Sequence, residues 1–198
     1  MITIHLLHGI HTSKKSRRLA ALVPIVERAS GMRTVYHEYG DIWGIQTRRQ
    51  NPIIAERLAP LIGPDDWLVG HSNANPIWLR SVRDFGARPQ GMVILNGALN
   101  DSVEFPASLR EIHVYFNRYD EAVPWAALSP HWMTDPLWGD MGRDGYRGSD
   151  PRVTHNIDCW GQRTLPPLSG HSSIIDAEAG PIWAQVWARR ISAASQSR

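Results

Sequence analysis

The stretch DWLVGHSNAN, residues 66–75, leads from a short apolar run into a serine with small neighbours. Gly70 and Ala74 stand two residues before and two residues after Ser72, which fits the pattern G-x-S-x-G with alanine in the last position. A nucleophilic serine on a sharp turn between a strand and a helix needs such neighbours, because larger side chains would crowd its Oγ. The stretch therefore predicts a strand, a strained turn at Ser72 and a helix, in that order.

Around this stretch, apolar runs rich in β-branched residues alternate with segments of helical period. This alternation is typical of βαβ units built around a mostly parallel sheet. Strands are predicted near residues 2–8, 32–38, 66–70, 92–97, 112–117 and 152–158. The predicted fold class is therefore α/β, with a twisted sheet of about six strands and helices on both of its faces.

The segments of helical period lie between these strands. Helices are predicted over residues 14–29, from about 51 to 62, directly after 72, and over 176–191. Pro52 is placed in a first turn, where its missing N–H costs nothing, and Pro76 also lies near a helix start. Pro24 is a potential kink in the first helix. Residues 192–198 lack large apolar side chains, so this tail is predicted to fray.

Length and charge limit the classes of function. A chain of 198 residues suits one domain, here residues 1–198. Its 21 basic and 19 acidic residues give a net charge of only +2, so nucleic acid is not an expected partner, and the basic run at 13–18 is interpreted as a solvated helix face. The single Cys159 cannot form an internal disulfide bond. Neither a long apolar run nor a signal-peptide pattern occurs, which predicts a cytoplasmic protein without integral membrane contact.

An activated serine needs a histidine base within hydrogen-bond reach and a carboxylate that orients this base. In a doubly wound sheet, functional groups gather at the carboxyl ends of the strands. Asp120 directly follows one predicted strand, and His171 lies in a loop between the last strand and the final helix. Glu121 and Asp101 remain alternatives for the acid, and His155 remains an alternative for the base.

These residues fall within four motifs that resemble those of the α/β-hydrolase superfamily. In the family's order they are LLHGI at 6–10, GHSNA at 70–74, DEAVP at 120–124 and GHSS at 170–173. The resemblance covers nearly the whole chain and implies a compact serine hydrolase, with Ser72 as nucleophile, Asp120 as acid and His171 as base. It also implies that the backbone N–H groups of Ile10 and Asn73 form the oxyanion hole.

Many members of this family carry a cap domain over the active site, and this sequence has no room for one. About a dozen residues separate the strands near 92–97 and 112–117, which is too few for a cap domain. The segment 125–151 carries Trp125, Trp132 and Trp138 among glycines and prolines, and is predicted to be an irregular excursion that could form a lid. The site is therefore expected to be open, or covered by this segment alone.

Residues next to the predicted oxyanion hole and the excursion are candidates for substrate binding, namely His11, His71 and Trp125. His8 is interpreted as structural. No metal site is predicted from His5, His8 and His11, because a strand points the first two to opposite faces. The second GHS, at 170–172, is a poor nucleophile elbow since Ile174 occupies its fifth position.

We therefore expect hydrolysis of a small-molecule or lipid-like carboxylic ester through an acyl-enzyme, without a cofactor. Thioesterase, amidase or acyltransferase chemistry on the same triad remains an alternative. A rival from another class is a binding module with an unused triad. An anion- or nucleic-acid-binding protein that uses the basic run at 13–18 ranks last.

Overall fold

A computed structural model describes residues 1–10, 18–40, 42–122, 134–160, 165 and 170–197. Six strands form one fully parallel sheet in the order β2-β1-β3-β4-β5-β6. The strands are β1 (Thr3–Leu7), β2 (Arg33–His37), β3 (Trp67–His71), β4 (Gly91–Leu95), β5 (Glu111–Phe116) and β6 (Val153–Asp158). The six predicted strands are confirmed.

The direction of sheet growth changes at β1, which pairs with β2 on one side and with β3 on the other. In doubly wound sheets, the loops that leave the carboxyl ends of the two strands at such a switch point diverge and leave a crevice. Here the two strands are β1 and β3, which end at Leu7 and His71. The switch point therefore lies where the chain continues into Gly9 and Ser72.

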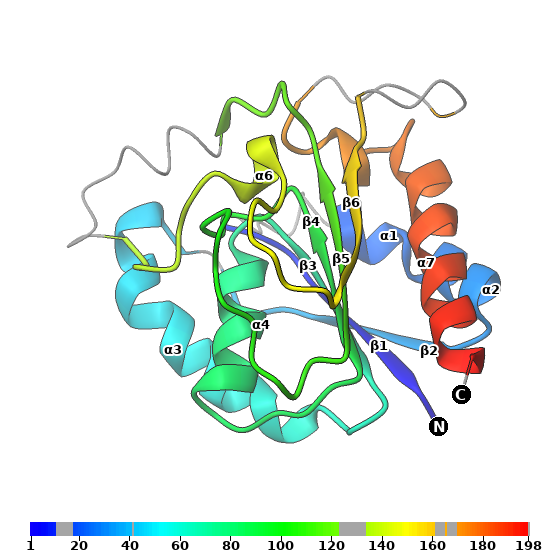
Figure 1. Ribbon diagram of the computed structural model, residues 1–198, viewed down its shortest axis with the longest axis horizontal. Coiled ribbons are helices and arrows are strands. Elements are labelled where there is room, and N and C mark those ends of the chain that lie inside the picture. The colour runs from blue at the N-terminus through cyan, green and yellow to red at the C-terminus, as the bar shows by residue number, and fades with distance from the viewer. Residues whose placement is uncertain (11–17, 41, 123–133, 161–164, 166–169, 198) are drawn as a thin grey trace.

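Helices cover both faces of the sheet (Figure 1). One face carries α1 (Arg18–Ala21), α2 (Val23–Ser30) and α7 (Gly180–Gln196), and the other carries α3 (Thr47–Leu58) and α4 (Ala74–Arg83). Two apolar cores result, because successive strand residues point to opposite faces. Val69 packs into the core under α7, whereas its neighbour Leu68 packs into the core under α3 and α4. No helix in the described part of the chain combines the length and the apolar character that a membrane crossing requires.

The helix predicted over 14–29 is interrupted. Its described part forms α1 and α2, with Leu22 between them. Pro24 lies in the first turn of α2 and has no N–H to donate to the carbonyl of Ala20, so the ladder of backbone hydrogen bonds restarts there. The sequence predicted one helix with a potential kink at Pro24, and the structure has a break into two helices just before this proline.

The second helix begins earlier than predicted. Helix α3 starts at Thr47, directly after the 3-10 turn η1 (Gly44–Gln46), so Pro52 occupies its sixth position rather than its first turn. Pro52 therefore removes one backbone hydrogen bond within the helix. Thr47 Oγ1 donates to the carbonyl of Gly44 at 2.6 Å and links the turn to the helix.

The last helix also differs from its prediction. It begins at Gly180, after the 3-10 turn η3 (Ser173–Ile175), and continues to Gln196 through most of the tail expected to fray. Ile191 is fully buried, and Ser195 Oγ accepts a hydrogen bond of 3.1 Å from Nε1 of Trp67. These contacts hold the last turns of α7 against the start of β3.

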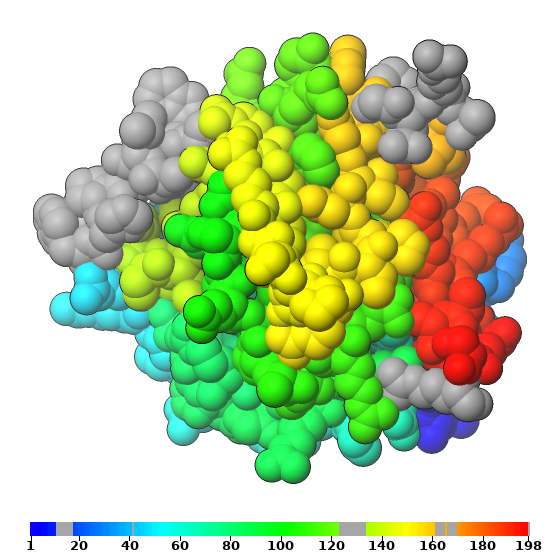
Figure 2. Space-filling view, in the orientation of Figure 1, coloured from blue at the N-terminus to red at the C-terminus, as the bar shows by residue number. Residues whose placement is uncertain are grey.

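Of the predicted excursion over 125–151, the structure describes residues 134–151. The short α6 (Met141–Asp144) is the one helix within these described residues. Figure 2 shows this part of the chain, in yellow-green and yellow, over the front of the molecule. The side chain of Trp138 is buried.

Two buried tryptophans offer a test of how much one hydrogen bond stabilises the core. Trp78 Nε1 donates to the carbonyl of Val69 at 3.1 Å, whereas Nε1 of Trp187 has no hydrogen-bond partner among the described residues. Both indoles are fully buried. We expect Trp78→Phe to lower the free energy of unfolding by about 1 kcal/mol more than Trp187→Phe. Urea unfolding measures both changes, and equal losses would contradict the expectation.

Candidate active site

Ser72 directly follows β3 and has a φ of 57°, in the left-handed region. Its backbone N–H donates to the carbonyl of Leu95 at 3.1 Å, and its own carbonyl accepts the N–H groups of Asn75 and Ala98, each at 3.2 Å. Such a conformation costs a non-glycine residue about 1–3 kcal/mol and persists only where the surroundings fix it. These hydrogen bonds fix the turn, and strain of this kind is concentrated at functional sites.

Two glycines make room for this turn. A Cβ on Gly9 would lie 2.7 Å from Cβ of Ser72 and 3.1 Å from the carbonyl oxygen of His71. A Cβ on Gly70 would lie 2.5 Å from Oδ1 of Asn75. Neither position has room for a side chain, which gives a physical reason for glycine in both LLHGI and GHSNA.

His171 lies in the loop between β6 and α7, and its Nδ1 is 2.6 Å from Oδ2 of Asp120. Asp120 follows β5 and is 1% exposed, and its Oδ1 accepts the backbone N–H of Ala122 at 3.0 Å. The carboxylate accepts the Nδ1 proton, so the free lone pair of the neutral imidazole is on Nε2. Asp120 thus fixes the orientation of the His171 ring, as the predicted triad requires.

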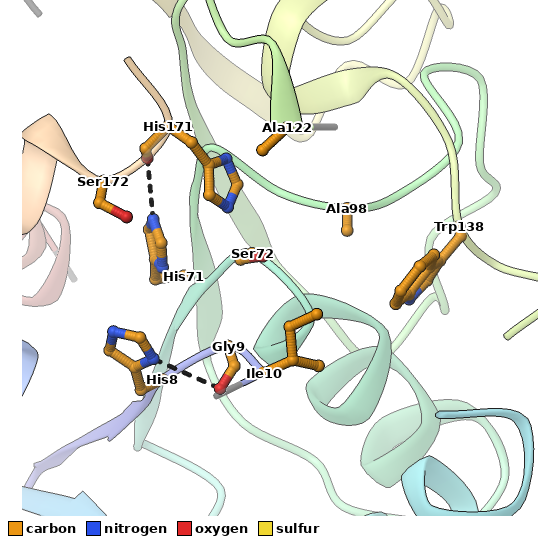
Figure 3. A pocket seen from close by; sticks show the side chains of 10 residues that line it. All are labelled: His8, Gly9, Ile10, His71, Ser72, Ala98, Ala122, Trp138, His171 and Ser172. Carbon is orange, nitrogen blue, oxygen red and sulfur yellow. Dashed lines mark hydrogen bonds between the residues drawn. The ribbon is translucent and has the colours of Figure 1, made fainter. Parts of the chain in front are cut away.

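Ser72 and His171 face one cavity of about 270 Å³. In Figure 3 the ring of His171 lies over Ser72. Histidines form one side of the cavity and apolar side chains the other, the lining residues being His8, Gly9, Ile10, His71, Ala98, Ala122, Trp138 and Ser172. Between Ser72 Oγ and His171, both within the described part, there is no hydrogen bond. Catalytic hydrogen bonds are often long in the absence of substrate and tighten when it binds.

Side chains from three neighbouring strand ends hold the loop that carries His171. The carbonyl of His171 accepts Nε2–H of His71 at 3.0 Å and Nδ2–H of Asn96 at 2.7 Å. The carbonyl of Gly170 accepts Nδ2–H of Asn117 at 3.3 Å. Because β3, β4 and β5 are parallel neighbours, their carboxyl ends present these donors side by side.

Solved structures share this architecture. A proposed hydrolase of the α/β superfamily from Xanthomonas campestris pv. campestris matches with a TM-score of 0.53 and 14% sequence identity, over 96% of this chain and 96% of its own. A proposed YdeN-like hydrolase from Pectobacterium atrosepticum matches with a TM-score of 0.53 and 15% identity, over 99% of this chain and 91% of its own. The chain has the α/β-hydrolase fold. No protein-family model and no curated protein matches the sequence.

In the α/β-hydrolase fold, the oxyanion hole combines the N–H after the nucleophile with an N–H from another loop at the same edge. The corresponding groups here belong to Asn73 and Ile10. Ile10 lines the cavity, and within the described part of the chain neither of these backbone N–H groups donates a hydrogen bond. The predicted role requires N–H groups without such a partner, and it stays a prediction.

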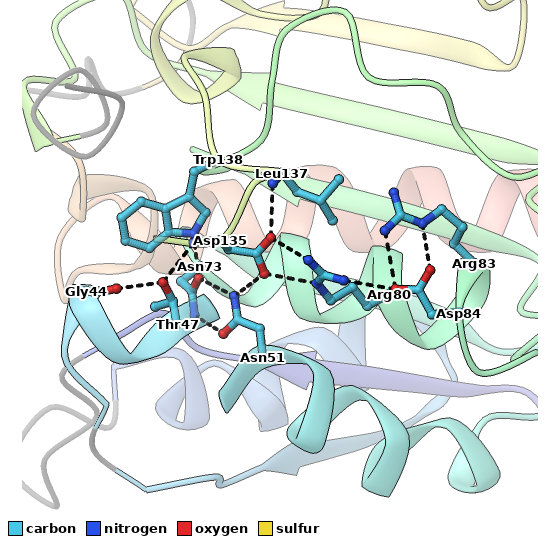
Figure 4. A network of polar contacts seen from close by, with 10 residues as sticks. All are labelled: Gly44, Thr47, Asn51, Asn73, Arg80, Arg83, Asp84, Asp135, Leu137 and Trp138. Atoms are coloured by element: carbon cyan, nitrogen blue, oxygen red, sulfur yellow. Dashed lines mark hydrogen bonds and ion pairs between the residues drawn. The ribbon is translucent and has the colours of Figure 1, made fainter. Parts of the chain in front are cut away.

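The side chain of Asn73 joins a buried polar network (Figure 4). Its Oδ1 accepts Nε1–H of Trp138 at 2.7 Å and Nδ2–H of Asn51 at 2.9 Å. Its Nδ2 donates to Oδ1 of Asn51 at 2.9 Å, and Asn51 donates in turn to Oδ2 of Asp135 at 2.8 Å. The residue after Ser72 is thereby tied to α3 and to a wall of the cavity.

Asp135 is the charged centre of this network. Its side chain is fully buried and accepts Nε–H of Arg80 at 3.0 Å and Nη2–H at 2.8 Å. The backbone N–H of Leu137 also donates to its Oδ1 at 3.0 Å. The paired donors of Arg80 match the two carboxylate oxygens, which is the strong form of this ion pair. Asp135 therefore fastens residues 134–138 onto α4.

His8 and His71 line the cavity as neutral rings. Burial lowers the pKa of His8 and lowers that of His71 well below its usual value, and the nearby His171 acts in the same direction on both. The ring centroids of His71 and His171 are 4.8 Å apart. Neutral His71 can thus donate Nε2–H to the carbonyl of His171 without placing a positive charge beside the ring of His171.

The structure places the remaining predicted residues as follows. Of the substrate-binding candidates, His71 lines the cavity, whereas His11 and Trp125 lie outside the described residues, as do residues 125–133 of the segment expected to act as a lid. Among the alternatives to the triad, Glu121 is exposed and His155 lies in β6. Asp101 is 3.6 Å from Arg147, whereas Asp120 contacts His171.

Several residues that shape the site were not predicted. Asn96 had a signal, since a polar residue follows an apolar strand at the functional edge of the sheet, and its φ of 41° marks a second strained turn. No sequence signal marks Asn51 and Asp135. Asn51 meets both Asn73 and Asp135 only through the tertiary structure. Ala98 and Ser172 are also new to the cavity lining.

The two carboxylate partners of Arg80 provide a matched stability test. Asp135 is fully buried, whereas the side chain of Asp84 is 31% exposed. Asp135→Asn removes one charge of a buried pair, so we expect a loss of about 3–5 kcal/mol in the free energy of unfolding. Asp84→Asn should cost at most about 1 kcal/mol. Urea unfolding measures both, and similar losses would show that burial of the pair is not the decisive factor.

The neutral state of His71 makes stability depend on pH. In the unfolded chain its pKa returns toward 6.5, so the unfolded state binds more protons than the native state as the pH falls below that value. The free energy of unfolding should therefore decrease on acidification. We expect the decrease between about pH 7.5 and about pH 5 to be smaller in His71→Gln. An unchanged decrease in this variant would mean that His71 does not contribute to it.

Proposed function

We propose that the protein is a serine hydrolase that cleaves carboxylic esters through an acyl-enzyme. The observation that carries the proposal is the 2.6 Å contact between Asp120 and His171, in a cavity that also holds Ser72 in a strained turn. An oriented base and a half-buried serine in one cavity, with free N–H groups nearby, form the arrangement that acyl transfer requires. The two solved neighbours are named as hydrolases, which supports hydrolysis in general, and their likeness to this chain is one of fold.

In the first half of the proposed reaction, Nε2 of His171 removes the proton of Ser72 as Oγ attacks the ester carbonyl. The carbonyl oxygen becomes an oxyanion, which accepts hydrogen bonds from the backbone N–H groups of Ile10 and Asn73. Asp120 stabilises the imidazolium without taking its proton. The intermediate then expels the alcohol, which receives the proton from Nε2, and Ser72 remains acylated.

In the second half, water replaces the alcohol. Nε2 of His171 takes a proton from the water as its oxygen attacks the acyl carbonyl, and the same N–H groups hold the new oxyanion. Collapse of this intermediate returns the proton to Oγ of Ser72 and releases the carboxylic acid. Each step uses groups that the protein itself supplies.

The cavity favours an apolar acyl or alcohol group. Ile10, Ala98, Ala122 and Trp138 line the side that faces the histidines. Trp138 is fixed by its hydrogen bond to Asn73, so this wall is firm close to the nucleophile. Burial of an apolar group against such a wall contributes about 25 cal/mol per Å² of apolar surface removed from water.

The proposal can be tested with p-nitrophenyl esters of increasing acyl length, using the wild type, Ser72→Ala and His171→Ala. We expect both substitutions to lower kcat at least about 1,000-fold, because nucleophile and base act as a unit. Ser172→Ala is the matched control, since Ser172 lines the same cavity but does not follow β3. It should keep kcat within about tenfold.

A fluorophosphonate probe separates the alternatives, because it reacts with an activated serine whatever the natural substrate is. We expect labelling of the wild type and of Ser172→Ala, and none of Ser72→Ala. If Ser72 is labelled but no ester is hydrolysed, the proposed substrate class changes from an ester to a thioester or an amide, or the reaction becomes acyl transfer to an acceptor. Full activity in Ser72→Ala, or neither labelling nor hydrolysis in the wild type, would overturn the proposal, and the second result would favour a binding module.

A further inference from the structure

Three potential metal ligands meet on the face of the sheet that α7 covers. Glu111 and His113 lie on β5, and His155 lies on the edge strand β6. Each offers one ligand atom, and these atoms lie within 4.8 Å of one another. Among the described residues, no other group of three or more histidine, cysteine or acidic side chains meets the same criterion.

The backbone brings these side chains together. Residues 111 and 113 are two apart on one strand and therefore point to the same face. His155 is paired with His113 across the parallel ladder, and the register shifts between Ile112 and His113. Irregularities of this kind at sheet edges re-aim side chains. The ring centroids of His113 and His155 are 4.4 Å apart.

Burial differs among the three side chains in a way that suits a site open from one side. His113 is fully buried, Glu111 has a side chain 21% exposed, and His155 is half-buried. Figure 2 shows β6, in deep yellow, reaching the surface beside α7, in red. A small ion could enter past His155 while His113 supplies a fixed ligand below.

Hydrogen bonds around Thr154 determine which nitrogen of His155 is free. The hydroxyl of Thr154 donates to Oε1 of Glu111 at 3.0 Å, and its oxygen is 3.0 Å from Nδ1 of His155. Since the hydroxyl proton is used by Glu111, Nδ1 of His155 must be the donor in the second contact. The lone pair of His155 is then on Nε2, and Thr154 supports two of the three ligands.

From this arrangement we propose that Glu111, His113 and His155 bind one divalent transition-metal ion, with Zn²⁺ as the best fit. Two imidazoles and a carboxylate are a donor set that Zn²⁺ uses in sites with three protein ligands and one open position. Zn²⁺ lies about 2.0–2.2 Å from such donors. The three ligand atoms lie within 4.8 Å of one another, so the proposed site requires a shift of the half-buried His155 side chain toward the ion.

Ion binding replaces an existing contact. Nε2 of His113 is now 2.8 Å from Oε1 of Glu111, so the Nε2 proton bridges the two residues. The ion takes the place of this proton, which moves to Nδ1. Nδ1 of His113 has no hydrogen-bond partner among the described residues, so the shift breaks no further bond.

The positive charge of Arg190, on α7, lies close enough to act on His113 and His155, so it repels a cation bound there. Its Nη1 donates to the hydroxyl of Tyr115 at 3.1 Å, which holds the guanidinium in place. Glu111 supplies the compensating negative charge inside the site. An ion that links Glu111 and His113 to His155 would fasten the edge strand β6 to β5.

The proposed metal site is separate from the proposed active site. Glu111 is in register with Gly91, which is in register with Trp67 at the start of β3. Ser72 follows the opposite end of β3. Metal binding and ester hydrolysis can therefore be tested independently, and failure of one leaves the other intact.

The test is calorimetric titration of ZnCl₂ into the untagged full chain, for the wild type, His155→Gln and Glu111→Gln. We expect one ion per chain in the wild type and a loss of affinity of at least about tenfold in each variant, because even residues that only support metal ligands cost 10- to 100-fold. Addition of Zn²⁺ should also raise the Tm of the wild type and not that of the variants. Buried His113 is left unchanged to spare the core.

His37→Gln is the matched control. His37 is a half-buried histidine on the opposite edge strand β2, its pKa is also lowered to about 4, and its Nε2 is 2.8 Å from Nδ1 of His5. This variant should bind Zn²⁺ like the wild type. Absence of stoichiometric binding in the wild type, or equal affinity in His155→Gln and Glu111→Gln, would overturn the proposal.

Discussion

The close approach of Gly9 to Ser72 is the contact on which the arrangement of the site depends. The first strand and the third strand end side by side at the switch point, and a Cβ on Gly9 would lie 2.7 Å from Cβ of Ser72. Because Gly9 has no side chain, the loop after β1 approaches Ser72 closely, and the N–H of Ile10 lies at the same edge of the sheet as Ser72. A larger residue at position 9 would push the loop after β1 away from Ser72.

A second constraint on the turn at Ser72 is the buried polar network around Asn73. Asn73 directly follows Ser72, and its side chain belongs to the buried network that ends in the pair of Arg80 and Asp135. A buried ion pair contributes little net stability, but it is costly to break once formed. The network therefore serves to fix one arrangement of α3, α4 and residues 134–138 around the turn at Ser72.

The parts of this structure that local sequence determines were predictable. The strands follow from apolar runs, and Ser72, Asp120 and His171 follow from short motifs whose neighbours along the chain carry the information. The contacts that could not be predicted join distant residues. The bond between Trp67 and Ser195, 128 residues apart, extends α7 through a tail whose composition indicated fraying.

The same limit explains the missed polar residues. Asp135 belongs to an irregular segment without periodicity, and its partner Arg80 is 55 residues away. Neither residue has a neighbour in sequence that marks it as buried. Pro24 and Pro52 show a milder form of this limit, since proline indicates a boundary or a break but not the residue at which the helix begins.

The loop of His171 is held by its carbonyl oxygen, to which His71 and Asn96 donate, while Asp120 holds Nδ1 of the ring. The imidazole thus has a fixed pivot at its backbone and a second one at Nδ1. In the proposed reaction, a small swing of the ring between these two points would move Nε2 from the serine oxygen toward a departing group. Proton transfer in both directions would then proceed on the timescale of a side-chain libration, without the slower rearrangement of a loop.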